Sequence, residues 1–119
     1  MGTQDTRAFV TAMFDSWQND GDTGPLLAAL ADDLHWTVPG TSPIAGVYTS
    51  RQEYLEGVYE RLDERLERWP VPRVRQIVAD GDWAVVLWHG AEGLGRRGED
   101  YVMDYTWWIR VQGTGASAR

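Results

Sequence analysis

The hydrophobic periodicity of the chain changes between its two halves, and this change constrains the fold most. Up to about residue 66, most apolar residues recur every three or four positions, as on one face of a helix. From about residue 74 they form short runs separated by turn residues, as in strands. Helices followed by a run of strands predict an α+β fold, with the helices on one face of an antiparallel sheet.

Three helices are expected in the first half. The first spans residues 6–18, and Thr23 caps a short second one. The third begins at Arg51, because residues 50–53 fit a capping box in which the serine and the glutamate satisfy free backbone N–H groups. Its apolar stripe comprises Leu55, Val58, Tyr59, Leu62 and Leu66.

Four segments have the alternation of strands, and the last three follow one another with only turns between them. They are residues 34–38, 74–79, 83–91 and 101–111. Residues 112–119 are small and polar, so we expect a frayed tail. At 119 residues the chain has room for one core, and we expect a single domain over residues 1–119.

Charge and residue content exclude several classes of function. The formal charge of −7 and pI near 4.6 disfavour nucleic acid and anionic membranes as partners. There is no cysteine and there are only two histidines without ligand spacing, so we expect no metal and no cofactor. The N-terminus lacks a signal sequence and no segment approaches a membrane span, so a cytoplasmic location is expected.

Three segments carry a family resemblance. They are GDTGPLLAALADDLHWTVPGTSPIAG at residues 21–46, VADGDW at 78–83 and YTWWIRV at 105–111. Together with the element order they resemble the SnoaL-like branch of the superfamily that includes ketosteroid isomerases and limonene epoxide hydrolases, over residues 5–111. The resemblance implies a cone-shaped fold of the nuclear-transport-factor-2-like (NTF2-like) kind, in which a curved antiparallel sheet wraps on about three N-terminal helices.

One departure from the family pattern concerns the C-terminus. Family members usually continue from the last strand into a turn and a further strand, whereas here Val111 is followed by Gln112 and a small polar tail. A missing strand would expose a neighbouring sheet edge, which proteins usually cover. We therefore expect a partner chain there, in a homodimer or another oligomer.

The catalytic positions of known relatives do not carry over. The resemblance places the three ketosteroid-isomerase positions at Phe14, Val38 and Trp107, none of which can move a proton. The strand Arg and Asp of the epoxide hydrolases would fall at His89 and Ala91. Neither mechanism is complete in this sequence.

His89 is the ionisable residue that the resemblance places in the pocket, on a strand face shared with Trp83, Val85 and Leu87. A histidine in an apolar cleft is suited to general acid–base catalysis near neutral pH. The alternative is a hydrogen-bonded core or rim histidine. Asp104 lies on the opposite face from Met103 and Tyr105, where a solvent or interface role is favoured over catalysis.

Large aromatic and apolar residues are the candidates for binding a flat hydrophobic ligand, although they are equally suited to fill the core. The candidates are Phe14, Trp17, Trp36, Val38, Tyr48, Tyr54, Val58, Trp83, Leu87, Tyr105 and Trp107. Residues 93–98 match the GxGxxG letters of a dinucleotide motif, but they lead into a strand rather than a helix. We interpret them as a hairpin loop.

Three hypotheses about function follow. The first is a pocket protein that binds a small hydrophobic metabolite, polyketide-like or otherwise cyclic, with His89 as a possible acid/base. The second is an oligomeric cyclase, isomerase or epoxide-hydrolase-type enzyme. The third is a non-catalytic association module that uses the sheet face around Trp108. Fold resemblance alone does not choose among them.

Overall fold

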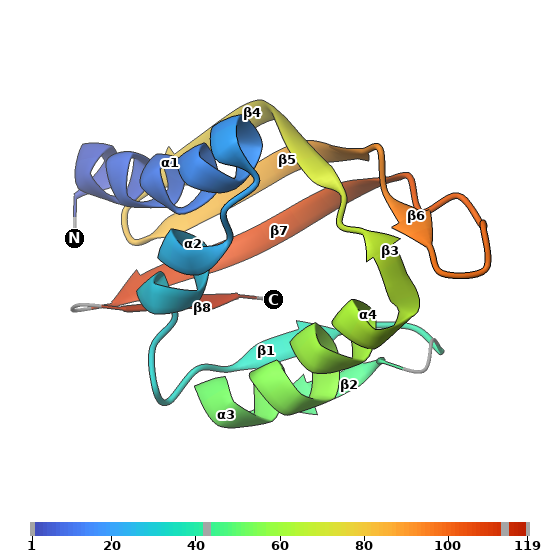
Figure 1. Ribbon diagram of the computed structural model, residues 1–119. Coiled ribbons are helices and arrows are strands. Elements are labelled where there is room, and N and C mark those ends of the chain that lie inside the picture. The colour runs from blue at the N-terminus through green and yellow to red at the C-terminus, as the bar shows by residue number, and fades with distance from the viewer. Residues whose placement is uncertain (1, 42–43, 113–114, 119) are drawn as a thin grey trace.

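A curved antiparallel sheet and two helical segments enclose one core (Figure 1). The computed structural model describes residues 2–41, 44–112 and 115–118. The helices are α1 (Thr3–Asp20), α2 (Gly24–Ala29), α3 (Arg51–Tyr54), the π-helical turn η1 (Leu55–Tyr59) and α4 (Glu60–Arg65). The strands are β1 (Trp36–Val38), β2 (Gly46–Tyr48), β3 (Leu66–Arg68), β4 (Val71–Asp80), β5 (Trp83–Ala91), β6 (Leu94–Gly95), β7 (Met103–Gln112) and β8 (Gly115–Ala118).

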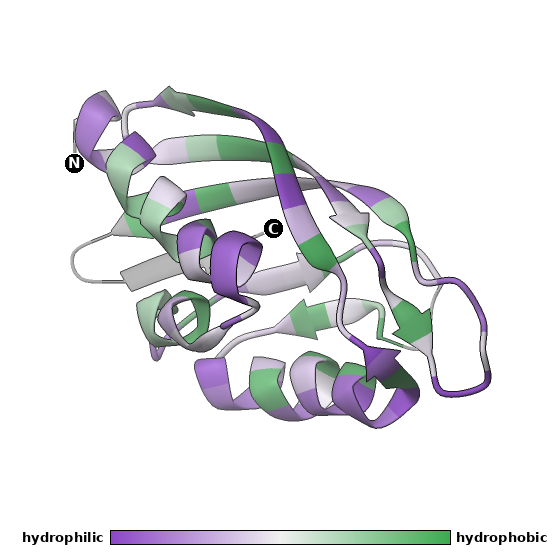
Figure 2. Ribbon diagram, turned by 45° about the horizontal axis from the view of Figure 1, so that its top comes forward, coloured by the Kyte–Doolittle hydropathy of each residue, from purple (hydrophilic) through white to green (hydrophobic). Residues whose placement is uncertain are grey.

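The expected α+β class is confirmed, and the main sheet has the order β4-β5-β7-β8 with antiparallel pairs throughout. Helix α1 packs across its inner face, and the continuous segment α3–η1–α4 lies farther away, beside the small β1–β2 hairpin (Figure 1). Figure 2 shows that the helices carry hydrophilic residues away from the sheet. The space between the two helical segments and the sheet is where the core lies.

Helix α1 is held by both its apolar stripe and its ends. Val10, Met13, Phe14 and Trp17 are buried at helical spacing. The helix stops at Gly21, whose φ of 71° suits glycine; the N–H of Gly21 donates to the carbonyl of Trp17, and that of Asp22 to the carbonyl of Ser16. It begins at Thr3, earlier than expected. Thr6 is buried within it, and its hydroxyl donates to the carbonyl of Gly81 at 2.6 Å.

The third helical segment starts as predicted but has an unexpected turn inside it. The N–H of Glu53 donates to Oγ of Ser50 at 3.0 Å, which confirms the serine cap. The carboxylate of Glu53 accepts from the N–H and the hydroxyl of Thr49, and these bonds lower its pKa. The π-helical turn follows, and within it a Cβ on Gly57 would overlap the ring of Tyr48.

Four strands differ from the expectations: β3 begins at Leu66, which was expected in the third helix, β6 lies in the expected hairpin loop, and β2 and β8 were not expected at all. Residues 46–48 lie in an expected loop, yet they pair with β1 as β2. Residues 112–119 are expected to fray, yet Gly115–Ala118 pairs with the end of β7, from Ile109↔Ala118 to Gln112↔Gly115. The edge of β7 is thus covered at that end, which corrects the expectation that no strand follows Val111. Residues 93–98 are followed by no helix, as expected, but they are not only a loop, because Leu94–Gly95 forms the short strand β6 and pairs with β3.

No helix in the described part of the chain is long and apolar enough to cross a membrane.

Candidate functional site

Side-chain alternation on β5 and β7 builds one wall of the site. The register pairs Trp88 with Tyr105, Val86 with Trp107, and Ala84 with Ile109. Paired residues of an antiparallel sheet share a face. Trp88, Val86 and Ile109 are buried, so this face is the inner one.

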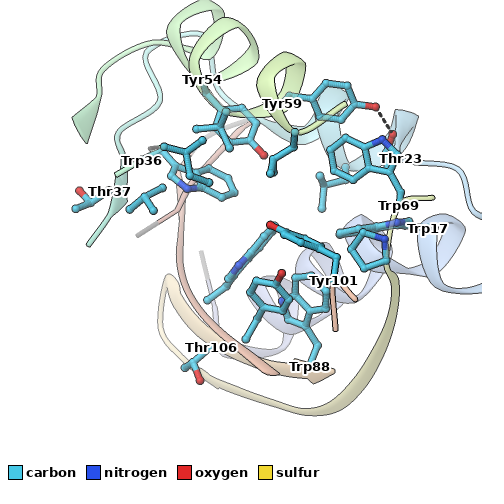
Figure 3. A pocket seen from close by; sticks show the side chains of 18 of the residues that line it. Trp17, Thr23, Trp36, Thr37, Tyr54, Tyr59, Trp69, Trp88, Tyr101 and Thr106 are labelled. Carbon is cyan, nitrogen blue, oxygen red and sulfur yellow. Dashed lines mark hydrogen bonds between the residues drawn. The ribbon is translucent and has the colours of Figure 1, made fainter. Parts of the chain in front are cut away.

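The inner face, α1, α2, β1 and the η1 segment surround a cavity of about 240 Å³ (Figure 3). Nearly all of its lining residues are aromatic, aliphatic or hydroxyl-bearing. They are Trp17, Thr23, Leu26, Trp36, Thr37, Val38, Pro39, Ile44, Tyr54, Val58, Tyr59, Leu62, Trp69, Pro70, Trp88, Tyr101, Tyr105, Thr106 and Trp107. No carboxylate, imidazole or guanidinium is among these described residues.

Aromatic rings in the cavity wall pack directly against one another. Trp36 stacks on Tyr54 at 4.2 Å and meets Trp107 edge-on at 4.9 Å between ring centroids. Trp88 stacks on Tyr105 at 4.2 Å and meets Trp107 edge-on at 5.3 Å. Such pairs add stability beyond the area they bury, and they restrict ring rotation. The wall is therefore preformed and presents flat apolar surfaces.

The phenol groups of Tyr54 and Tyr105 remain neutral. Burial, with a smaller contribution from Tyr59, raises the pKa of Tyr54 well above its ordinary value. Burial, followed by the nearby Tyr101, does the same for the pKa of Tyr105. The hydroxyls of Thr23 and Tyr59 lie 3.1 Å apart and bond to each other (Figure 3). The hydroxyl groups at the cavity are hydrogen-bonding partners.

Trp88 contributes a polar atom without a partner. Its indole Nε1 is buried and makes no hydrogen bond within the described structure. An unsatisfied buried donor costs about 1–3 kcal/mol.

Most of the expected ligand-binding residues do lie at the cavity wall: Trp17, Trp36, Val38, Tyr54, Val58, Tyr105 and Trp107. Phe14 lies one layer behind, with its ring 5.4 Å from that of Trp107. Tyr48 is outside the cavity, packed on Gly57, and donates to the carbonyl of Ile44.

The structure reverses the expected orientation of β5. Trp83, Val85, Leu87 and His89 point to the outer face, because the alternate residues Ala84, Val86 and Trp88 are the buried ones. His89 therefore does not line the cavity. Its Nδ1 lies 2.8 Å from Oδ1 of Asp104, whose predicted outward orientation is confirmed.

Two neighbouring side chains on the outer face stabilise the charged form of Asp104. The hydrogen bond from His89 and, to a smaller extent, the charge of Arg75 lower its pKa. Arg75 lies 3.7 Å away from it. Asp104 is exposed, so the surrounding water competes with these interactions.

Sequence reasoning missed several lining residues. Trp88 was missed because β5 is apolar on both faces, and Tyr59 and Leu62 were treated only as the helix's buried stripe. Trp69 lies between β3 and β4, and Tyr101 lies just before β7, so both are outside the strands, where alternation gives no signal. Within the described residues, no group of three or more potential metal ligands comes together.

Comparisons with known proteins bear on the fold. None of the curated proteins matches the sequence. An NTF2-like protein of Burkholderia thailandensis superposes with a TM-score of 0.77 at 21% identity, over 100% of this chain and 91% of that one. An NTF2-like protein of Burkholderia pseudomallei gives 0.78 at 19% identity, over 97% and 89%. TerC, co-crystallised with polyporic acid, gives 0.73 at 17% identity, over 95% and 87%.

At these identities the likeness shows the fold alone, which is the NTF2-like fold that the sequence resemblance implies. The family comparison is more specific, because the SnoaL-like domain matches residues 10–117. That match spans both helical segments and every strand of the main sheet. The chain therefore belongs to the SnoaL-like domain family.

Proposed function

We propose that this protein binds a small, flat, uncharged hydrophobic molecule in the cavity between the sheet and the helices. The observation that carries the proposal is an aromatic wall with no ionised side chain among its described residues. Burying a charged ligand there would leave its charge unpaired, which is costly. A neutral ring system would instead gain apolar contact on several sides.

The cavity volume sets the size of the ligand. A cavity of roughly 150 Å³ lined by apolar residues is enough to hold benzene. This one measures about 240 Å³, which suits a molecule of two or three fused or linked rings. TerC, which shares the fold, was co-crystallised with a small molecule, polyporic acid. That precedent supports a binding role for this chain.

Polar atoms at the cavity wall favour hydrophobic ligands that also carry hydrogen-bond acceptors. The neutral phenols of Tyr54 and Tyr105 have O–H groups able to donate. A ligand with a carbonyl or ether oxygen at the right place would accept a hydrogen bond from one of these O–H groups. We therefore favour a cyclic metabolite that carries hydrogen-bond acceptors.

Acid–base catalysis in the cavity has less support than binding. The lining residues include no group that takes up a proton at neutral pH, and His89 lies on the other side of the sheet. A neutral phenol is able to stabilise a developing oxyanion, but it does not replace a base. Binding is accordingly the function that the geometry supports best.

The experiment compares two probes that differ by one charge. N-phenyl-1-naphthylamine is neutral, and 8-anilinonaphthalene-1-sulfonate is the same ring system with a sulfonate. We expect fluorescence titration to give at least tenfold tighter binding of the neutral probe. Equal affinity, or tighter binding of the sulfonate, would contradict an uncharged ligand.

A matched pair of variants locates the binding. Leu62 lines the cavity and is only partly buried, so Leu62→Trp fills part of the space with little strain. Leu87 is exposed on the outer face, so Leu87→Trp leaves the cavity unchanged. We expect Leu62→Trp to weaken the neutral probe about tenfold and Leu87→Trp to have no effect. The reverse pattern would place the probe on the outer face.

A further inference from the structure

The loop of residues 92–102 joins β5 to β7 outside the main sheet. The pairing of these two strands ends at Gly90↔Met103, and the chain between them stands out beside β3 (Figure 1). Three backbone hydrogen bonds of 2.8 to 3.0 Å fold the loop on itself, from the N–H of Gly95 to Glu99, of Gly98 to Gly95 and of Tyr101 to Gly93. The loop is therefore a compact unit that is connected to the sheet at its two ends.

The C-terminal end of this loop lies at the mouth of the cavity. Tyr101 lines the cavity and is only half-buried, so its side chain borders both the ligand space and water (Figure 3). Leu62 of α4 and Trp69, just after β3, are further half-buried lining residues. The loop and the end of α4 thus both border the mouth.

Arg96 connects the loop to the end of α4. Its Nε donates to the carbonyl of Glu64 at 2.7 Å, and its Nη2 donates to that of Asp63 at 3.3 Å. Its backbone N–H donates to the carbonyl of Arg65 at 2.9 Å. The last carbonyls of a helix lack partners within the helix and attract a cation. Both side-chain bonds are exposed, so water competes for them and they can open reversibly.

The strand pair that joins the loop to β3 is short. Strand β6 has two residues, and it forms a two-stranded sheet with β3 that is separate from the main sheet. The two pairs, separated by a register shift, are Leu66↔Gly95 and Arg68↔Leu94. A two-stranded ribbon is marginally stable by itself. The bonds of Arg96 therefore matter for keeping the loop on α4.

Glu92 is suited to act as a hinge. Among the described residues it is the one residue other than glycine with a positive φ, at 63°. Such strained positions gather at ligand clamps and switch regions. Glu92 is exposed and follows Ala91, the last residue of β5, so rotation at this point moves the loop without disturbing the main sheet.

We propose that residues 92–102 are a lid that opens about Glu92 to admit the ligand, and that Arg96 is the latch that holds the lid on α4. The lid rests on the proposed binding function, because it determines how a ligand enters that same cavity. The rings elsewhere in the wall pack on one another, as Trp36 does on Tyr54. The exposed loop is the part of the boundary that opens most readily.

The latch should act on rates more than on affinity. It is closed both in the free protein and around a bound ligand, so its contribution cancels in the dissociation constant. It must open for entry and for release, so it slows both. Damage to the cavity wall would instead weaken the affinity without faster entry.

Stopped-flow fluorescence with N-phenyl-1-naphthylamine tests the latch. Arg96→Ala removes two bonds from a charged donor, so it should raise the association and dissociation rates about tenfold each and change the dissociation constant less than about threefold. Arg97→Ala is the control, because it removes the same charge from the same loop, and within the described residues the Arg97 guanidinium makes no bond to α4. Unchanged rates in Arg96→Ala, equal effects of both variants, or weaker affinity without faster association would overturn the proposal.

A second substitution at the same position covers a failure of Arg96→Ala to fold. Arg96→Lys keeps the charge but loses the planar fork that reaches two carbonyls. Its rates should lie between those of the wild type and of Arg96→Ala, or above the wild type if the alanine variant is unfolded by circular dichroism. Rates equal to the wild type would mean that the two-carbonyl contact does not hold the lid.

Hydrogen exchange of the free protein tests the lid without any ligand. The amide of residue 96 bonds to α4, whereas those of Gly95 and Tyr101 bond within the loop. In Arg96→Ala, corrected for intrinsic rates, the first should exchange about tenfold faster and the other two should be unchanged. If all three speed up equally, the loop unfolds instead of opening as a unit, and if none does, Arg96 is not a latch. Either result overturns the proposal.

The two experiments separate the lid from the binding function. A wild type that does not bind the probe contradicts the proposed binding function, and hydrogen exchange of the free protein then decides about the lid. A wild type that binds the probe, with no effect of Arg96→Ala on rates or exchange, contradicts the lid alone.

Discussion

The two faces of one sheet differ sharply, although adjacent residues of the same strands build them. The inner face of β5 and β7 carries Trp88, Tyr105 and Trp107 around a cavity without ionised side chains. The outer face carries the bonded His89 and Asp104 together with exposed apolar groups. A strand can therefore serve a ligand on one side and an ionic, solvent-accessible surface on the other, because its side chains alternate.

The largest expected effect is a difference in the free energy of unfolding between substitutions of two consecutive residues of β7. Ile109 is fully buried, so Ile109→Ala should lower the free energy of unfolding by about 2–5 kcal/mol. Arg110 is exposed on the other face, so Arg110→Ala should cost about 1 kcal/mol or less. Urea denaturation at a concentration where the protein is monomeric measures both. Equal losses would contradict the assignment of the faces.

Adjacent valines on β5 give a smaller and more specific contrast. Val86→Thr would bury a hydroxyl on the inner face at a cost of about 1–3 kcal/mol. Val85→Thr places the same hydroxyl on the outer face, where water reaches it, and should be nearly neutral in the monomer. Thermal unfolding of the two variants checks this. A larger loss for Val85→Thr would mean that β5 is inverted.

Alkaline pH should lower the stability of the protein through the buried phenol of Tyr54. The pKa of Tyr54 is raised by burial, so the unfolded chain loses this proton near pH 10 while the folded chain keeps it. Stability from this group is complete below pH 10 and falls above it, by up to about 1.4 kcal/mol per pH unit. The free energy of unfolding, measured by urea denaturation at several pH values between 8 and 11, should therefore fall less steeply with pH in Tyr54→Phe than in the wild type. Identical slopes would argue against a buried phenol.

The smallest effect concerns the outer face. His89 is the main cause of the lowered pKa of Asp104, so His89→Ala should return that pKa toward its ordinary value. The sign follows from the depressed pKa: any stability from Asp104 is present above the unfolded pKa and is lost as the pH falls through the folded one. Carbon-13 NMR titration of the carboxyl measures the shift. An unchanged pKa would exclude the hydrogen bond with His89.

The sequence was sufficient for the orientation of β7 but not for that of β5. On β7 the polar residues Asp104, Thr106 and Arg110 alternate with apolar ones, and this marks the outer face. Strand β5 is apolar on both parities from Trp83 to Trp88, so alternation gave no answer there. Its orientation follows only from the pairing with β7, and the long connection between the strands hides that register.

The third helical segment shows the same limit in a different form. Its capping serine and apolar stripe were predictable from residue spacing. The π-helical turn at residues 55–59 was not, because it adds a residue to the turn without any change in composition. The turn lies beside Tyr48, where Gly57 leaves room for the ring. This fit depends on a contact with Tyr48 of strand β2, which the helical spacing of the residues does not reveal.

Fluorine NMR of protein labelled with 5-fluorotryptophan tests the separation of the two faces most directly. Five of the seven tryptophans line the cavity, and Trp83 and Trp108 lie on the outer face. We expect the neutral naphthylamine probe to shift resonances of the cavity tryptophans and to leave those of Trp83 and Trp108 in place. A probe that shifts Trp108 and spares Trp88 and Trp107 would contradict the account.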